Sequence, residues 1–181
     1  MQAARFCSRF PDFRVAVNLS ARQLRDHSLV ESVAAALRAS GLKAHCLELE
    51  ITESVAIENV ELTLGVLGEL RKTGVRIAID DFGTGHSSLA SLKQLPVDEI
   101  KIDRSFIQDV ATDETDRVIV RCTVDLAHSL GLRVVADGVE DAETYALVAE
   151  LGCDEAQGLH LSPALRRRAL TSWISQQPLA A

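Results

Sequence analysis

The stretch VRIAIDDFGTGHSSL, from Val75 to Leu89, decides both the fold prediction and the site prediction. Its first residues alternate as in a half-buried β-strand, with Ile77 and Ile79 on one side. Two adjacent carboxylates, Asp80 and Asp81, then end the strand. Two such charges about 4 Å apart repel by about 4 kcal/mol at an effective dielectric constant of about 20. Either a divalent cation with oxygen ligands offsets this repulsion, or one Asp caps a helix while the other is solvated.

The bulk composition predicts one globular domain. The chain has 181 residues, of which 47% are hydrophobic, and its formal net charge is −7. This negative charge argues against binding to the backbone of double-stranded nucleic acid. The four cysteines form no CxxC pair, which favours reduced thiols in a cytoplasmic protein. No apolar run approaches the roughly 18 residues of a membrane-spanning helix, and no signal-peptide pattern is present, so no membrane segment is expected.

A repeated pattern, in which an amphipathic helix ends at a glycine and an apolar strand follows, predicts the secondary structure. The helix-ending glycines are Gly41, Gly74, Gly131 and Gly152. Strands are predicted over residues 14–18, 46–51, 75–80, 98–102, 133–137 and 153–157, with helices between them and one more near residues 164–176. Asp141 is the predicted N-cap of the helix that ends at Gly152, and Val118, Cys122 and Leu126 are predicted to share one face of another helix. Alternating strands and helices at this spacing indicate parallel strands with right-handed crossovers.

The two sides of the predicted strands differ in character. One side carries branched aliphatic residues, such as Ile100 and Ile102, and the other carries small or polar residues, such as Ala78 and Lys101. A doubly wound sheet is covered by helices on both faces and should be apolar on both. One aliphatic side and one polar side predict instead a (β/α) barrel whose mouth, at the carboxyl ends of the strands, forms a site.

Polar residues crowd the predicted carboxyl ends of the strands, which converge at one mouth in a barrel. They are Asn18, Glu50, Asp80, Asp81, Lys101, Asp103, Asp137 and Gln157. Such a set of oxygen donors suits Mg²⁺ or Mn²⁺, and it contains no Cys or His that would indicate zinc. Lys101 can activate water or hold an anionic substrate, or it can simply pair with Glu48 or Glu99 inside the barrel.

Six ordered motifs resemble those of the EAL domain family, which are cyclic-di-GMP phosphodiesterases with a modified TIM barrel. The motifs are VAVNLSARQL (Val15 to Leu24), LELEITES (Leu47 to Ser54), IDDFGTGHSSL (Ile79 to Leu89), LPVDEIKIDRSFI (Leu95 to Ile107), VVADGVE (Val134 to Glu140) and QGLHLSPA (Gln157 to Ala164). The resemblance runs from the start of the chain to about residue 170. It implies an α/β fold, an incomplete TIM-like barrel of the EAL type with about six of eight strands.

The resemblance also implies roles for individual residues, with two metal ions, Mg²⁺ or Mn²⁺, in the complete family site. The implied metal ligands are Asn18, Glu50, Asp80, Asp81 and Asp137. Lys101 is implied to orient or deprotonate the attacking water, and Glu53 to brace the loop that follows Asp81. Contacts to cyclic-di-GMP are expected from Asp103, Gln157, Ser20 and Arg22.

The chain departs from the family pattern in two ways. The family begins with two more strands, the second of which carries a Glu-Ala-Leu motif whose Glu is a metal ligand, and this chain contains no such tripeptide. Asp137 stands where the family usually has Glu, which shortens the reach of the carboxylate. We therefore expect residues 1–181 to form a single partial EAL domain, with the first two strands missing and the edge strands left partly unpaired.

The functional expectation is a cyclic-di-GMP phosphodiesterase domain that is impaired or inactive as this chain. One alternative is a non-catalytic module that binds cyclic-di-GMP or a protein partner. Another is that the chain is a fragment whose full product carries the missing strands. A homodimer is possible, as are GGDEF or sensory domains in a longer parent protein.

Overall fold

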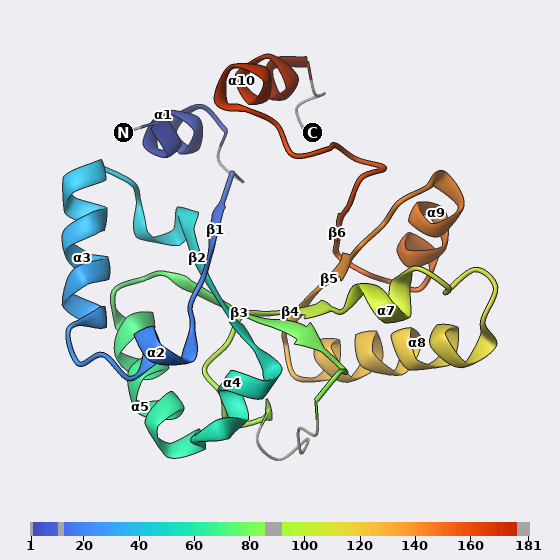
Figure 1. Cartoon of the computed structure of the whole chain (residues 1–181), viewed down its shortest axis with the longest axis horizontal. Coiled ribbons are helices and arrows are strands. Elements are labelled where there is room, and N and C mark those ends of the chain that lie inside the picture. The colour runs from blue at the N-terminus through green and yellow to red at the C-terminus, as the bar shows by residue number, and fades with distance from the viewer. Residues whose placement is uncertain (1, 11–12, 86–91, 177–181) are drawn as a thin grey trace.

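Six parallel strands form one sheet in chain order, β1-β2-β3-β4-β5-β6. The structure, a computed structural model, describes residues 2–10, 13–85 and 92–176. The strands are β1 (Val15–Asn18), β2 (Leu47–Thr52), β3 (Arg76–Phe82), β4 (Glu99–Ile102), β5 (Arg133–Asp137) and β6 (Glu155–Gln157). The sheet curls into a half-barrel with helices around it (Figure 1). Every predicted strand is present, and the predicted incomplete (β/α) barrel is confirmed.

Helices alternate with the strands as predicted. They are α1 (Gln2–Arg9), α2 (Ala21–Leu24), α3 (Leu29–Ser40), α4 (Glu53–Glu58), α5 (Val60–Lys72), α7 (Arg104–Ile107), α8 (Glu114–Ser129), α9 (Ala142–Glu150) and α10 (Arg167–Gln176), with a short 3₁₀ helix η1 (Ala44–Cys46). All four glycines predicted to end helices have positive φ angles. The Asp141 carboxylate accepts a hydrogen bond from the Thr144 N–H at 2.8 Å, which confirms the predicted cap of α9. Within the described residues, no helix is long and apolar enough to cross a membrane.

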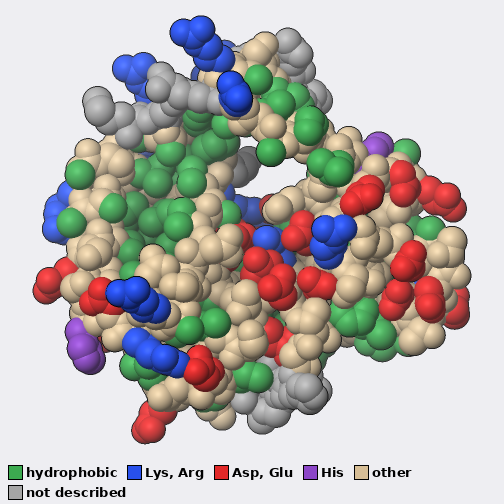
Figure 2. Space-filling view, in the orientation of Figure 1, with side chains coloured by type: hydrophobic (Ala, Val, Ile, Leu, Met, Phe, Trp, Pro, Cys, Tyr) green, Lys and Arg blue, Asp and Glu red, His purple; other side chains and the backbone are tan. Residues whose placement is uncertain are grey.

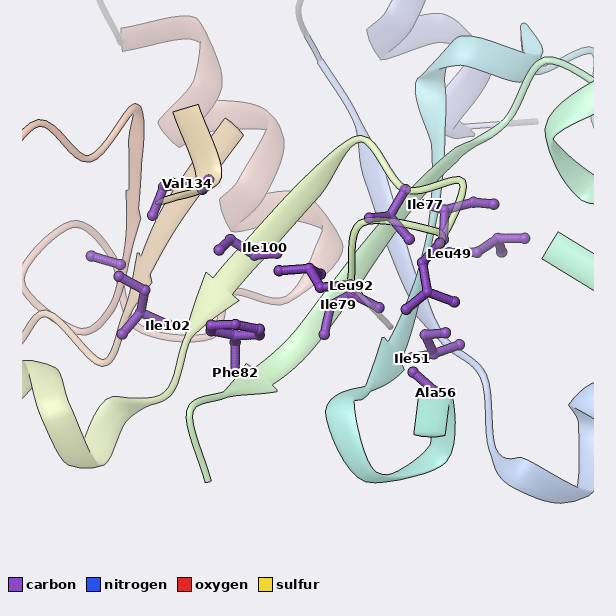
Figure 3. Close-up of a cluster of buried hydrophobic side chains, with 14 of the residues drawn as sticks. Leu49, Ile51, Ala56, Ile77, Ile79, Phe82, Leu92, Ile100, Ile102 and Val134 are labelled. Carbon is purple, nitrogen blue, oxygen red and sulfur yellow. The ribbon is translucent and has the colours of Figure 1, made fainter. Parts of the chain in front are cut away.

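The hydrophobic core lies between the convex side of the sheet and the helices. Aliphatic residues of β2, β3 and β4, such as Ile51, Ile77 and Ile100, are completely buried (Figure 3). Leu67 of α5 and Val120 of α8 are equally buried on the helix side. Burying each such side chain contributes roughly 1.5–3 kcal/mol to folding. The aliphatic sides of β2, β3 and β4 therefore face the helices, and their polar sides face the barrel interior.

The three residues predicted to share a face of α8 do so, but this face is not the buried one. Val118 is 52% exposed and Cys122 is also exposed, whereas Val120, Val124 and Ala127 are buried. Both sets of residues recur at helical spacing, so the sequence contains two apolar stripes. Packing against β4 and β5 selects the second stripe, because only one side of a helix can face the sheet.

The two edge strands have a partner on one side only, among the residues that the structure describes. β1 pairs with β2, and β6 pairs with β5, as the prediction of unpaired edges requires. Val17 of β1 is 43% exposed, which is unusual for a strand residue next to an apolar core. Arg14, just before β1, forms an ion pair with Glu155 at the start of β6 and so links the two edges through the barrel interior.

Candidate active site at the mouth of the half-barrel

The mouth is the end of the half-barrel formed by the carboxyl ends of the strands. Strand register brings the predicted site residues to this end. Asn18 lies opposite Glu50, and Asp137 lies opposite Gln157. Asp80 lies one step further along, opposite Thr52. Figure 2 shows acidic side chains gathered around the hollow at the centre of this view, with isolated basic side chains among them.

Lys101 lies at the centre of the mouth. Its Nζ is 3.0 Å from Glu50 Oε1 and 3.2 Å from Asp80 Oδ1, and both Lys101 and Glu50 are buried. Burial alone would lower the pKa of Lys101. The hydrogen bond to Glu50 and the negative charges of Glu50, Asp80 and Asp137 outweigh that effect and raise this pKa. Lys101 is therefore a fixed ammonium at neutral pH and joins three strands of the half-barrel.

A β-bulge turns Asp81 toward the same mouth. The register of β3 against β4 shifts between Ile79 and Phe82, and Asp81 has a φ of 54°. In a regular strand Asp81 would point to the helix side with Ile79, because successive side chains alternate. Burial, together with the negative charges of Asp80 and Asp103, raises the pKa of Asp81. We call Glu50, Asp80, Asp81, Lys101, Asp103 and Asp137 the mouth cluster.

Glu53 holds the loop that follows Asp81. Glu53 is the first residue of α4 and is buried, and its Oε2 accepts hydrogen bonds from the N–H groups of Gly83 at 2.8 Å and of Gly85 at 3.3 Å. A Cβ at Gly85 would lie 2.8 Å from Glu53 Oε1, so a larger residue there would force the Glu53 carboxylate to shift. Residues 86–89 of the motif from Val75 to Leu89 also belong to this loop and lie outside the described residues.

Four predicted site residues lie at the rim of the mouth rather than in the cluster. Asn18 and Gln157 are exposed at the ends of the two edge strands. Ser20 is the N-cap of α2, where its Oγ accepts a hydrogen bond from the Gln23 N–H at 3.3 Å. Arg22 is exposed on α2. Within the described residues, no hydrogen bond or ion pair joins these four side chains to the mouth cluster.

The donor atoms of the mouth suit a hard divalent cation, but the described side chains are not arranged to coordinate one. Five carboxylates face one ammonium, and all available donors are oxygen atoms. Within the described ranges, however, no group of three or more His, Cys, Asp or Glu side chains is arranged to hold a metal ion. Lys101 Nζ bridges Glu50 and Asp80. These two carboxylates would have to reorient in order to bind a metal ion.

The other end of the barrel interior holds a second charged group that sequence reasoning missed. We call Arg14, Glu48, Glu99, Arg133 and Glu155 the floor cluster. Arg14 Nε is 3.8 Å from Glu48 Oε2, Arg14 Nη2 is 3.7 Å from Glu99 Oε2, and both Arg14 and Arg133 form ion pairs with Glu155. The alternative that Lys101 pairs with Glu48 or Glu99 is therefore wrong.

Period-two spacing could have revealed the floor cluster. Glu48 and Glu99 lie two residues before Glu50 and Lys101 on the same strands, and so on the same inward side. Burial, followed by the charges of Glu48 and Glu155, raises the pKa of Glu99 from 4.5 to about 7.

A parallel half-barrel with a carboxylate-rich mouth defines a TIM-type α/β domain with its site at the strand carboxyl ends. The chain belongs to the EAL domain family, because the family model for the EAL domain matches residues 1–164.

Relatives and solved structures agree with this assignment. The chain is 44% identical over 161 residues to the cyclic di-GMP phosphodiesterase NbdA of Pseudomonas aeruginosa, covering 89% of this chain and 21% of that protein. The solved structure of PaMucR phosphodiesterase, a c-di-GMP complex, matches with a TM-score of 0.88 and 41% identity over 93% of this chain and 68% of that one. A calcium/cy-diGMP complex of Klebsiella pneumoniae BlrP1 matches with a TM-score of 0.76 and 31% identity over 87% of this chain and 41% of that one. The chain spans about a fifth of the length of the curated relatives that it matches.

Proposed function

We propose that this chain carries the catalytic mouth of an EAL-type cyclic-di-GMP phosphodiesterase and that, as these 181 residues, it hydrolyses the dinucleotide slowly. The observation that carries the proposal is the buried bridge from Lys101 to Glu50 and Asp80 at the carboxyl ends of three strands. Family membership and the names of the relatives supply the substrate class.

The mouth residues are assigned three roles: metal binding, orientation of water and phosphate, and positioning of a loop. Asn18, Glu50, Asp80, Asp81 and Asp137 would hold Mg²⁺ or Mn²⁺, which when bound supplies a Lewis acid and lowers the pKa of a bound water. Lys101 acts as a cationic hydrogen-bond donor that orients the water and the phosphate, because its raised pKa keeps it protonated at neutral pH. Glu53 positions the loop after Asp81 through its two backbone hydrogen bonds.

Substrate contacts are assigned to the rim. Arg22 is an exposed cation near the mouth and suits a phosphate oxygen, and Gln157 can both donate and accept hydrogen bonds to a base. The Ser20 hydroxyl caps α2, so Ser20 contributes to substrate binding chiefly by fixing the conformation of this turn. Asp103 accepts from the Ser105 N–H at 2.9 Å and caps α7 while adding negative charge beside Asp81.

Slow hydrolysis is proposed because these 181 residues contain no Glu-Ala-Leu motif. Losing one carboxylate ligand would weaken metal binding and water positioning. Removing one preorganised catalytic group costs about 10² to 10³ in rate. Asp137 is a second weakness, because its side chain is one methylene shorter than the Glu usual at that position. Asp137→Glu is accordingly expected to raise the rate.

A second function, non-catalytic binding of cyclic-di-GMP or of a protein partner, is favoured by one specific observation. Lys101 already pairs with Glu50 and Asp80, and the described residues contain no formed metal centre. We also propose a cytoplasmic location, a possible homodimer, and GGDEF or sensory domains in a longer parent protein. One relative is named a bifunctional diguanylate cyclase/cyclic di-GMP phosphodiesterase, and the chain covers 22% of it.

The test compares hydrolysis of cyclic-di-GMP by this chain and by the same chain extended at its N-terminus with the Glu-Ala-Leu segment of a relative. Both proteins are assayed with Mn²⁺, and the linear product is measured by chromatography. We expect the extended chain to be faster by about 10² or more. A matched extension in which the motif Glu is replaced by Gln should return the rate to that of the short chain. Equal rates for the short and extended chains would contradict the proposed impairment, whereas binding without hydrolysis by both chains would favour the binding module.

A further inference from the structure

A cavity of about 610 Å³ opens at the amino ends of β3, β4 and β5, away from the mouth. It is lined by the last turn of α5, by the segment that precedes β4, and by the junction between α8 and β5. We propose that this cavity binds a phosphate-bearing small molecule of about the size of a nucleotide. The proposal does not depend on the function assigned to the mouth.

The lining of this cavity is cationic although the chain is acidic overall. Arg71, Arg76, Lys93 and Arg133 line it together with one carboxylate, Asp98. The formal net charge of the whole chain is −7, whereas four cations and one carboxylate line this cavity. An excess of positive charge inside a concave surface raises the local concentration of anions.

Two of the four cations form no close ion pair within the part of the chain that the structure describes. Arg71 Nη2 is 3.2 Å from Asp98 Oδ1, and Asp98 Oδ2 also accepts a hydrogen bond from the Ile77 N–H at 3.0 Å, so the one carboxylate is already engaged. Arg133 forms its ion pair with Glu155 of the floor cluster. For Arg76 and Lys93, no hydrogen bond or ion pair is found within residues 2–10, 13–85 and 92–176.

Arg76 interacts electrostatically with Glu48 but forms no ion pair with it among the described residues. Glu48 is the residue of β2 that lies opposite Arg76. The Glu48 carboxylate lies closer to Arg14, at 3.8 Å from its Nε. Arg76 is only half-buried, so its guanidinium can reach a ligand in the cavity.

The walls and the size of the cavity indicate what else the ligand carries. Leu132 is partly exposed and supplies apolar surface next to the cationic groups, whereas Leu95 and Val97 are almost completely buried in this wall. The volume lies within the roughly 300–1,000 Å³ of ordinary small-molecule sites and is far larger than a phosphate group needs. Guanidinium groups match phosphate oxygens with paired hydrogen bonds, and apolar walls suit a flat ring. A nucleotide combines both features.

The cavity is separate from the mouth. Arg76 and Asp80 lie at opposite ends of the straight part of β3, and Arg133 and Asp137 bound β5 in the same way. Four residues of parallel strand correspond to about 13 Å at a rise of about 3.3 Å per residue. A ligand held by Arg76 therefore cannot also be held by Asp80 or Lys101 in the same pose.

Isothermal titration of the chain with adenosine monophosphate tests the proposal, with inorganic phosphate and adenosine as the two half-ligands. We expect adenosine monophosphate to bind more tightly than either half-ligand. Arg76→Gln combined with Lys93→Gln should weaken that binding about tenfold or more, because each charge-assisted hydrogen bond contributes appreciably to affinity. The control carries the same change in charge elsewhere, as Arg38→Gln with Lys43→Gln, both exposed residues outside the cavity lining, and should change the affinity less than about twofold.

The Lys101→Ala variant distinguishes binding of the nucleotide in the cavity from binding in the mouth. It alters the mouth and should leave binding of adenosine monophosphate unchanged. Absence of binding at millimolar nucleotide, equal weakening by the cavity and control pairs, or equal affinity for phosphate and the nucleotide would each overturn the proposal. Loss of binding in Lys101→Ala would do so as well, since it would place the nucleotide in the mouth.

Discussion

The mouth and the floor of the half-barrel are built from neighbouring inward positions of the same strands, yet they handle charge differently. In the mouth cluster one buried ammonium, Lys101, faces five carboxylates. In the floor cluster two arginines, Arg14 and Arg133, are shared among three glutamates. The mouth is thus left with a surplus of negative charge, whereas most of the floor's charge is compensated within the protein.

The two clusters differ in how far their buried charges are compensated by the protein itself. Taking a carboxylate out of water is costly unless a cation or hydrogen-bond donors compensate it. The floor carboxylates Glu48 and Glu99 lie 3.8 and 3.7 Å from Arg14, and burial still raises the pKa of both. Asp81, held at a φ of 54° with a raised pKa beside Asp80 and Asp103, is compensated only in part. Raised carboxylate pKa values occur at both ends, so the features that distinguish the mouth are its surplus of negative charge and the positive φ of Asp81.

Lys101→Ala should have the largest effect on activity. In the chain extended with the Glu-Ala-Leu segment, we expect cyclic-di-GMP hydrolysis to fall by about 10² to 10³, because a preorganised cation next to the reacting water is lost. Binding of labelled cyclic-di-GMP should change little. Lys43→Ala, which removes an exposed lysine far from the strand carboxyl ends, serves as the control. Retained turnover in Lys101→Ala would remove Lys101 from the mechanism.

Arg14→Met should have the largest effect on stability. It leaves Glu48, Glu99 and Glu155 with one fewer cation and breaks the link between the edge strands. Removing one partner of a buried ion pair costs about 3 kcal/mol or more, and Arg14 is mostly buried. Urea unfolding measures the loss. The control is Arg25→Met, whose pair with Glu58 is more than half exposed and should contribute less than about 1 kcal/mol. Equal losses in the two variants would show that the floor cluster does not stabilise the fold.

The pH dependence of the free energy of unfolding reports on the protonation of Glu99. Its pKa is raised from 4.5 to about 7 by burial and by the charges of Glu48 and Glu155, so the folded chain keeps a proton that the unfolded chain has released. The contribution of this group to the free energy of unfolding therefore falls as pH rises through that window and is fully lost above it. At about 1.4 kcal/mol per pKa unit, the whole fall amounts to about 3 kcal/mol.

Glu99→Gln removes this proton linkage. We expect the unfolding free energy of the variant to change less steeply between about pH 5 and about pH 7 than that of the unaltered chain. Glu61→Gln, which changes an exposed carboxylate on α5, should keep the original slope. Parallel pH profiles for the chain and Glu99→Gln would mean that Glu99 is already ionised in the folded protein.

Local sequence signals determined the strands but not the partners of the charged residues. Glycines at helix ends and aliphatic alternation locate every strand to within two residues of its predicted bounds. Alternation also predicts which side of each strand faces inward. It cannot rank Glu48, Glu50, Asp80 and Glu99 as partners of Lys101, because all four face the same interior. That choice depends on strand register and on Arg14, which lies within ion-pair distance of Glu48 and Glu99.

Two further features depend on tertiary structure. Regular alternation would place Asp81 on the helix side with Ile79, and only the bulge in β3 brings it to the mouth. The motif resemblance placed it there, but residue spacing alone did not. The choice of the buried face of α8 also depends on packing, since the sequence offers two apolar stripes, one through Val118 and one through Val120.

Binding of Mn²⁺, followed by electron paramagnetic resonance, tests the contrast between mouth and floor most directly. We predict that the chain binds Mn²⁺ and that Asp80→Asn combined with Asp81→Asn weakens this binding about tenfold or more, because two of the available oxygen donors lose their charge. Glu48→Gln combined with Glu99→Gln removes the same number of carboxylates from the floor and should change the affinity less than about twofold. Absence of Mn²⁺ binding at millimolar concentration, or equal weakening by the two double variants, would contradict the assignment of the mouth as the metal-receptive end of the half-barrel.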